Sequence, residues 1–449
     1  MVAAQKPDPQ ATLDRLIKAA RQAGADAADA IVVSSVSAGV SYRLGKLEDV
    51  ERAESTDLGL RVFVGQRVGF VSSSDISERG LSELPARAVA MARLAPEDRF
   101  AGIAPVELLA TSIPDLDLDD KHEPATEALV EAARAIEGAA MAVKGITNSE
   151  GGSASYGRSD VTLATSAGFN GRYTASSYGI GVSVLAGEGV SMERDDDSAS
   201  ARHFADLEDA QTVGRRAGER AIARLNPRKA KSQTVPVVYD PRASNGLVGH
   251  LISAISGAAV ARGVSFLKDR MGQAVFAKGI SIIDDPHRLR GLRSKPFDGE
   301  GVRNHRWALI EDGMLKTWLL DCTSAKQLGL TTTGHAARGT GSGPSPSPTN
   351  LYMAPGNVTR DALIADIEEG FYVNELMGMG VNNVTGDYSR GASGFWIEKG
   401  KIAYPVSEVT IAGNLKDMFA NLAPADDLVF RYGVNAPTLR IESMTVAGA

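Results

Sequence analysis

Two adjacent stretches of this chain, 154–170 and 171–187, alternate small polar and apolar residues and are rich in Ser, Thr and Gly. Alternation with a period of two places apolar side chains on one face of a strand and polar side chains on the other. The chain also has 47 glycines in 449 residues, above the average share of about 7%. Because glycine suits turns and bulges, both features predict extensive antiparallel β-sheet.

Periodicity and turn signals divide the chain into two parts. Helical spacing predicts helices over 11–23, 82–94, 125–143 and 207–225, with Pro85 in the first turn of the second helix. A polar segment at 226–232 is a linker, and a strand over 235–239 and a helix over 244–261 follow it. We therefore expect an α+β protein with two domains. These are an N-terminal α/β layer domain, 1–228, and a C-terminal domain rich in antiparallel β-sheet, 229–449.

The charge balance argues against several classes of partner. The formal net charge is -7, and no concentrated Lys/Arg face appears, so we expect no nucleic acid partner. No stretch reaches 18 apolar residues, and the first residues lack the pattern of a secretory signal, so we expect no membrane partner. The single cysteine, Cys322, suits a reducing compartment and a small buried role. The expected location is the cytoplasm.

A search for catalytic residues finds no complete set. None of the six histidines lies within one helical turn of another, and His122-Glu123 is followed by Pro124 rather than by a zinc-binding helix. Ser265 and Lys268 fit the S-x-x-K pattern of a serine–lysine hydrolase, but its supporting S-D-N and K-T-G motifs are missing.

Two polar segments have less specific interpretations. The charged run 193–197 contains three aspartates, but neighbouring strand residues point to opposite faces, so we interpret it as a solvated strand end rather than a metal site. The segment 334–355 is rich in Gly, Ser and Pro. It is either a mobile loop that faces a cleft or partner, or a surface insertion.

Several blocks of the second half resemble the TldD/PmbA (peptidase U62) family, and in particular its PmbA/TldE branch. These blocks are 246–257, 297–302, 328–336, 375–378, 385–396 and 404–418. In the TldD branch, the helix that corresponds to the first block, 246–257, carries an HExxxH motif, and a cysteine near the C-terminus completes a zinc site. Carried over position by position, the motif falls on Gly249, His250 and Ala254, and the segment 433–438 has no cysteine.

The resemblance implies a fold like that of TldD/PmbA and a role as the noncatalytic, metal-free subunit of a TldD/TldE heterodimeric zinc metallopeptidase. No catalytic residue and no cofactor are expected in this chain, and zinc is expected in the TldD-like HExxxH partner. The substrate implied is an unfolded peptide, which the complex degrades or trims. An older family name, modulator of DNA gyrase, is interpreted as an indirect effect.

Four residues are candidates for contact with the peptide or the partner. His250 lies near the former metal position, with a core histidine as the alternative. Asp387, Tyr388 and Arg390 belong to a polar, Gly-flanked segment that is either a binding loop or a hydrogen-bonded turn. A further segment, 414–417, is interpreted as the start of a helix.

Two other functions remain open at this point. One is a stand-alone hydrolase with an unrecognised nucleophile, for which Ser265 and Lys268 are the candidates. The other is a regulatory peptide-binding protein that acts without a TldD-like partner.

Overall fold

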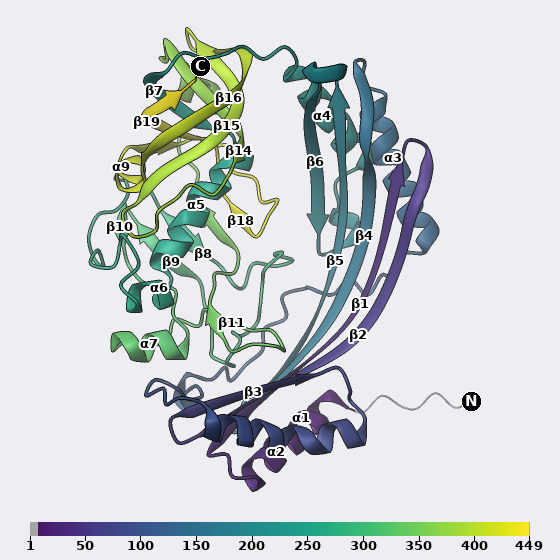
Figure 1. The fold of residues 1–449 in the computed structure, drawn as a ribbon, viewed down its shortest axis with the longest axis vertical. Helices are drawn as coiled ribbons and strands as arrows, with labels where there is room; N and C mark the ends of the chain where they lie inside the picture. The colour runs from purple at the N-terminus through teal and green to yellow at the C-terminus, as the bar shows by residue number, and fades with distance from the viewer. Residues whose placement is uncertain (1–7, 449) are drawn as a thin grey trace.

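A computed structural model describes residues 8–448. A long, curved antiparallel sheet runs along one side of the molecule. The C-terminal half, from β7 (Gln233–Tyr239) onward, lies on its concave side (Figure 1). The strand order in this sheet is β3-β2-β1-β4-β5-β6. The strands are β1 (Ala27–Arg43), β2 (Lys46–Val64), β3 (Arg67–Ser73), β4 (Ile146–Thr165), β5 (Asn170–Ala186) and β6 (Glu193–Ala201).

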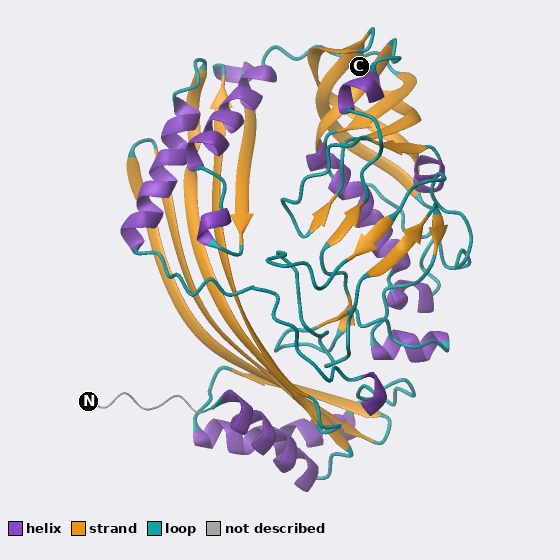
Figure 2. Ribbon diagram, turned by 180° about the vertical axis from the view of Figure 1, so that it is seen from behind, coloured by secondary structure: helices purple, strands orange, loops and turns teal. Residues whose placement is uncertain are grey.

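The alternation in the sequence explains why this sheet has one apolar face at its upper end. In β5, Tyr178, Ile180, Val182 and Val184 are buried, whereas the residues between them are glycines and serines that are only partly buried. The buried valines and Ile180 pack against α3 (Thr126–Met141) and α4 (Ala210–Ala223) on the outer face (Figure 2). The prediction of antiparallel strands over 154–187 is confirmed.

Two further helices cover the lower end of the sheet. They are α1 (Pro9–Gln22) and α2 (Glu78–Leu94), which pack on β1 and β2 around Leu13, Leu60 and Leu84. The prediction for Pro85 was wrong: α2 begins four residues earlier than expected, because Ser77 accepts a hydrogen bond from the backbone N–H of Gly80 and caps the helix. Pro85 is therefore the eighth residue of α2.

The C-terminal half contains two sheets that share one core. The larger sheet has the strand order β16-β15-β14-β7-β19-β17, and an additional pairing of β16 with β19 closes a ring of strands. Its strands are β7 (Gln233–Tyr239), β14 (Glu369–Met377), β15 (Asp387–Glu398), β16 (Lys401–Asn414), β17 (Leu422–Pro424) and β19 (Leu439–Ala447). All pairings in this sheet are antiparallel except that of β7 with β14. The expected α+β class and the abundance of antiparallel strands are confirmed.

The smaller sheet, β10-β9-β8-β13-β18, is built from short strands. These strands are β8 (Ile282–Asp284), β9 (Trp307–Glu311), β10 (Met314–Leu315), β13 (Leu351–Met353) and β18 (Val434–Asn435). Between the two sheets runs α5 (Pro241–Ile255), whose buried side chains include Leu247, Leu251 and Ile255. Short helices complete the half: α6 (Gly257–Ala261), α7 (Cys322–Leu328), α8 (Arg360–Ile364) and α9 (Leu415–Ala420).

The segment 334–355 is packed against both halves rather than free of them. It forms a small hairpin of β11 (Ala336–Ala337) and β12 (Ser345–Pro346), followed by β13. At its turn, Thr340 lies so close to β2 that a Cβ at Gly59 would stand 2.3 Å from its carbonyl oxygen. The close approach requires glycine at position 59 and identifies the segment as a contact between the N-terminal sheet and the C-terminal half.

A buried ion cluster joins the two halves close to Gly59 on β2. Arg61 on β2 donates to Asp29 on β1 and to Glu300 of the C-terminal half, and Arg338 also pairs with Asp29. All four side chains are at most 4% exposed.

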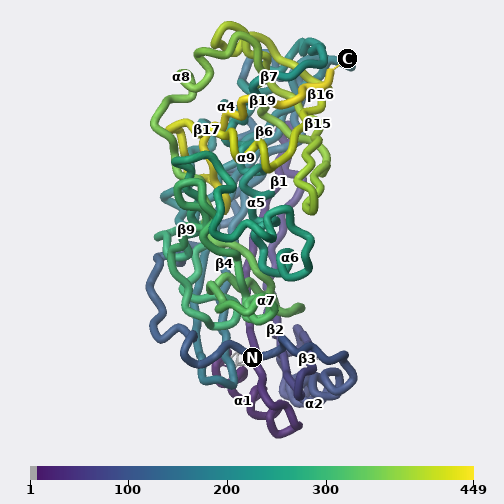
Figure 3. Tube along the Cα trace, turned by 90° about the vertical axis from the view of Figure 1, so that its left-hand side faces the viewer, coloured from purple at the N-terminus to yellow at the C-terminus, as the bar shows by residue number. Residues whose placement is uncertain are grey.

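Seen from the side of the C-terminal half, the lower end of the sheet and its two helices lie below that half (Figure 3). No helix within residues 8–448 has the length and apolar character that a bilayer crossing requires.

Candidate functional site

The centre of the candidate site is α5, the helix that carries positions 249, 250 and 254. Asp240 caps the helix by accepting from the N–H of Arg242, and Pro241 supplies a preformed first turn. Gly249 faces open space, since a Cβ at this position would meet no atom within 4 Å. Ala254 is fully buried in the core. Five residues along an α-helix correspond to a rotation of about 140°, so these two positions point in different directions.

The C-terminal segment that follows Gly433 lies beside this helix. The backbone N–H of Ala436 donates to Asn245 at 3.1 Å, and the side chain of Asn435 bonds to the backbone around Tyr432. A zinc site needs three or four nitrogen, sulfur or oxygen ligands. Glycine and alanine supply none, so the residues at 249 and 254 do not fit a zinc ion. Within residues 8–448, no group of three or more His, Cys, Asp or Glu side chains has a metal-binding arrangement.

Three of the four predicted contact residues come together at α5. The rings of His250 and Tyr388 meet edge to face, with centroids 5.7 Å apart. Arg390 follows Tyr388 by two residues on β15 and therefore points to the same face of the sheet. Asp387 points to the opposite face, where it accepts from Thr385 at 2.6 Å and from Asn414 at 3.0 Å. The structure thus assembles His250, Tyr388 and Arg390, and places Asp387, the first residue of β15, on the opposite face. The prediction of a loop or turn at 387–390 was wrong, because these residues pair with β16 as part of β15.

His250 is held in its neutral form. Burial lowers its pKa from 6.5 to about 4, and the positive charge of Arg390 acts in the same direction. The Nε2 atom of His250 is buried and has no hydrogen-bond partner among the described residues. A neutral imidazole can donate one hydrogen bond and accept another, so the buried Nε2 of His250 can bond to a polar group of either kind.

The shifted pKa predicts how stability depends on pH. The pKa of His250 in the folded state lies below that in the unfolded state, so protons favour unfolding between pH 6.5 and 4. His250→Gln removes this titrating group. Over this range, the free energy of unfolding of the variant should therefore fall by about 2–3 kcal/mol less than that of the unmodified protein. Urea unfolding of both proteins at pH 7 and pH 4.5 tests this. Parallel losses in the two proteins would contradict it.

The other sequence candidates have structural roles. Asn414 is the N-cap of α9 and accepts from the N–H of Lys416, as predicted for the segment 414–417. Ser265 is buried, and its hydroxyl donates to the carbonyl of Ala254 at 2.6 Å, whereas Lys268 is exposed. In the described part of the chain, the only hydrogen bond between the two residues runs from the backbone N–H of Lys268 to the carbonyl of Ser265, and none joins their side chains. Cys322 is buried, and burial raises its pKa, which makes the thiol a poor nucleophile.

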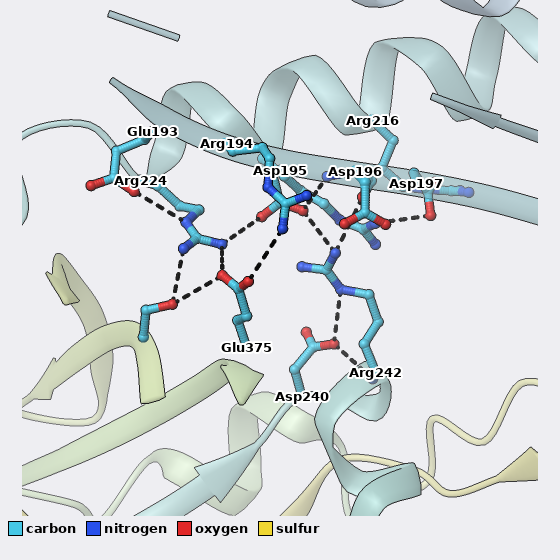
Figure 4. Close-up of polar contacts among 12 residues, drawn as sticks. Glu193, Arg194, Asp195, Asp196, Asp197, Arg216, Arg224, Asp240, Arg242 and Glu375 are labelled. Carbon is cyan, nitrogen blue, oxygen red and sulfur yellow. Dashed lines mark hydrogen bonds and ion pairs between the residues drawn. The ribbon is translucent and has the colours of Figure 1, made fainter. Parts of the chain in front are cut away.

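The interpretation of the run 193–197 as a solvated strand end was wrong. Asp195 and Asp197 point to the same face of β6 and are 3% exposed. Asp195 pairs with Arg242 at 2.8 Å and with Arg224 at 3.5 Å (Figure 4). Asp197 pairs with arginines of α4, with Arg220 at 3.0 Å. The two aspartates are buried because arginines from two directions neutralise them.

We call this set of ion pairs the arginine network. It links the two halves, because Arg242 belongs to α5 while Asp195 belongs to β6. In addition, Arg224, the C-cap residue of α4, pairs with Glu375 of β14 at 2.5 Å. Further members are Glu193, Arg194, Asp197, Glu208, Arg216, Arg220, Asp240 and Arg431. Sequence reasoning missed it, although Arg216, Arg220 and Arg224 are spaced one helical turn apart and form a basic stripe along α4 and its C-cap.

A cleft of about 440 Å³ lies between β6 and the C-terminal half, beside this network. It is bordered by Arg194, Asp196 and Ser198 on β6, by Gly246 on α5 and by Asn374 and Arg390 on β14 and β15. Since β6 is the edge strand of its sheet, one side of its backbone is not paired with another strand. The cleft therefore combines an unpaired strand edge with charged and polar side chains.

Sequence comparisons match almost the whole chain to one family. Models of PmbA/TldA metallopeptidase domain 1, central domain and C-terminal domain match residues 28–92, 114–225 and 232–448. A protein of Escherichia coli O157:H7 named metalloprotease PmbA is 38% identical over 94% of this chain and 92% of its own length. A metalloprotease PmbA homolog of Haemophilus influenzae is 37% identical over 100% of this chain and 98% of its own.

Solved structures have the same fold. A Bacteroides thetaiotaomicron protein described as a candidate modulator of DNA gyrase has a TM-score of 0.90 at 26% identity, over 98% of both chains. TldE from Thermococcus kodakarensis has a TM-score of 0.87 at 21% identity, over 97% of this chain and 100% of its own. The likeness to the latter concerns the fold alone.

Proposed function

Because this chain belongs to the PmbA/TldD metallopeptidase family, we propose that it is the metal-free subunit of a two-subunit zinc metallopeptidase. Its partner in this proposal is a relative that carries the HExxxH motif, holds the zinc ion and cleaves or trims unfolded peptides. The proposed location is the cytoplasm, which the lone, buried thiol of Cys322 suits.

The observation that carries this proposal is the chemistry of α5. A metallopeptidase needs ligands that hold the ion and a carboxylate that takes a proton from the bound water. At the corresponding positions this chain has Gly249, His250 and Ala254, and none of them is a carboxylate. His250 is neutral, and Ala254 lies in the core. The surrounding fold is complete, so we infer that this chain contributes binding and shape while the partner contributes the chemistry.

The cleft supports a peptide as the substrate. An extended peptide can add to a sheet edge through main-chain hydrogen bonds, and β6 is such an edge. The β6 side chains that line the cleft are Arg194, Asp196 and Ser198. None of them is a bulky apolar residue that would cover this edge. An unfolded peptide fits this arrangement because it can adopt the strand conformation.

Copurification with an HExxxH-bearing relative from the same source tests the proposal. We expect a stable complex in gel filtration that cleaves an unstructured peptide, and no cleavage by this chain alone. Chelator-resistant cleavage by the isolated chain would support a stand-alone hydrolase instead. Peptide binding by this chain, with no association with the relative, would support a regulatory peptide-binding protein.

A further inference from the structure

Polar atoms without hydrogen-bond partners are concentrated around the cleft. In residues 8–448, they include Nε of Arg390, Oδ1 of Asn374 and Nε of Arg242, which all belong to side chains that line the cleft, and all three are buried. A buried polar atom without a partner loses its hydration and gains nothing in return, so natural proteins rarely leave several close together. Their presence beside one cleft indicates that a polar ligand completes their hydrogen bonds.

Arg390 differs from the other arginines that border the cleft. Arg224 and Arg242 are neutralised by Asp195 and Glu375, but Arg390 has no ion-pair partner in the described chain. Its guanidinium lies over α5, where Nη1 is 3.8 Å from the position that a Cβ of residue 246 would occupy. Because residue 246 is glycine, no side chain from this position covers the guanidinium. The side chains that line the cleft include four arginines and three carboxylates, so the excess charge there is positive.

Asn374 supplies a different hydrogen-bonding group. It lies at a bulge in β14, where the pairing register with β15 shifts between Val373 and Glu375. The bulge leaves Asn374 without a paired residue on β15, and its side chain lines the cleft. The residue is only 9% exposed. Its unpartnered Oδ1 is a hydrogen-bond acceptor. The ligand group that it binds is therefore an N–H donor and not an anion.

We propose that this cleft binds a peptide carboxylate, with Arg390 pairing with the carboxylate and Asn374 accepting a backbone N–H of the same peptide. The C-terminal residue of a peptide, unless it is proline, carries a carboxylate and a backbone N–H together, and a carboxylate also occurs on Asp and Glu side chains. The planar guanidinium suits either, since it can form two parallel hydrogen bonds to a carboxylate. This inference extends the proposed function, because it assigns this chain a part in selecting the peptide.

Binding of fluorescent unstructured peptides to the full-length chain tests the inference. Three versions of one peptide separate the sources of the carboxylate. One has a free C-terminus, one has an amidated C-terminus, and one has Asp and Glu replaced by Asn and Gln. The protein variants are Arg390→Gln and, as a matched control, Arg79→Gln. Arg79 is exposed on α2 and also lacks an ion-pair partner in the described residues.

We expect removal of the responsible carboxylate to weaken binding about 10-fold or more, the effect of one lost charge-assisted hydrogen bond. Arg390→Gln should weaken binding of the free peptide equally and abolish the difference between the peptides, while Arg79→Gln changes neither. Equal affinity of the unmodified chain for all three peptides would overturn the inference, and so would an undiminished difference in a folded Arg390→Gln protein. Neither result bears on the complex with the HExxxH relative, so the proposed function is tested separately.

Discussion

Replacing the glutamate of the HExxxH motif in the proposed partner with glutamine is expected to lower peptide cleavage by the complex about 10²–10⁴-fold, the usual contribution of a general base. Gly249→Ala in this chain, at the neighbouring position of the corresponding helix, is expected to leave cleavage unchanged. The space beside Gly249 is open, so a methyl group meets no atom there. Alanine also favours a helix by about 1 kcal/mol over glycine, so the variant should fold at least as well.

The contrast between the two substitutions shows which subunit performs the chemistry. The measurement is the initial rate of cleavage at saturating peptide, with each variant mixed with its unmodified partner. A retained rate with the glutamine variant would mean that the HExxxH motif is not the source of catalysis. A large loss with Gly249→Ala, in a complex that still assembles, would place the reaction at α5 of this chain.

The second large effect is expected on stability. Arg61→Gln should lower the free energy of unfolding by about 3–5 kcal/mol, the cost of breaking a buried ion pair from one side. Arg61 is 4% exposed, and its guanidinium lies between the carboxylates of Asp29 and Glu300, which are each 1% exposed. Without the arginine, two buried negative charges share only Arg338. Because Glu300 belongs to the C-terminal half, the variant also loosens the contact between the two halves.

The matched control is Arg172→Gln. Arg172 also makes several hydrogen bonds to a carboxylate, that of Asp160, but its side chain is 58% exposed. Exposed ion pairs contribute about 0–1 kcal/mol. Urea unfolding followed by far-UV circular dichroism measures both variants. Similar small losses in both would show that the buried cluster does not stabilise the fold.

Local patterns in the sequence predicted the regular elements well, because each depends on neighbours within a few residues. The alternation over 171–187 identified β5, and the spacing of Leu13, Leu16 and Ile17 identified α1. Pro85 was misplaced because the start of α2 depends on the hydroxyl of Ser77 reaching one N–H, and a proline several residues away gives no information about that.

Contacts between distant segments were beyond what the sequence pattern could show. Asp195 and Asp197 resemble a solvated run until arginines of α4 and α5 are placed against them. In contrast, the common position of Tyr388 and Arg390 follows from the period of two in a strand, and the same period separates Asp387 from them. The sequence therefore named the candidate residues, but it predicted neither the strand that carries them nor the arginine network that borders the cleft.

The metal content of the purified proteins tests the central claim most directly. Elemental analysis of this chain alone should find no tightly held zinc, and the complex with its HExxxH relative should hold one zinc ion per pair of subunits. A stoichiometric zinc ion in the isolated chain, lost together with peptide cleavage in a folded His250→Gln variant, would contradict the account.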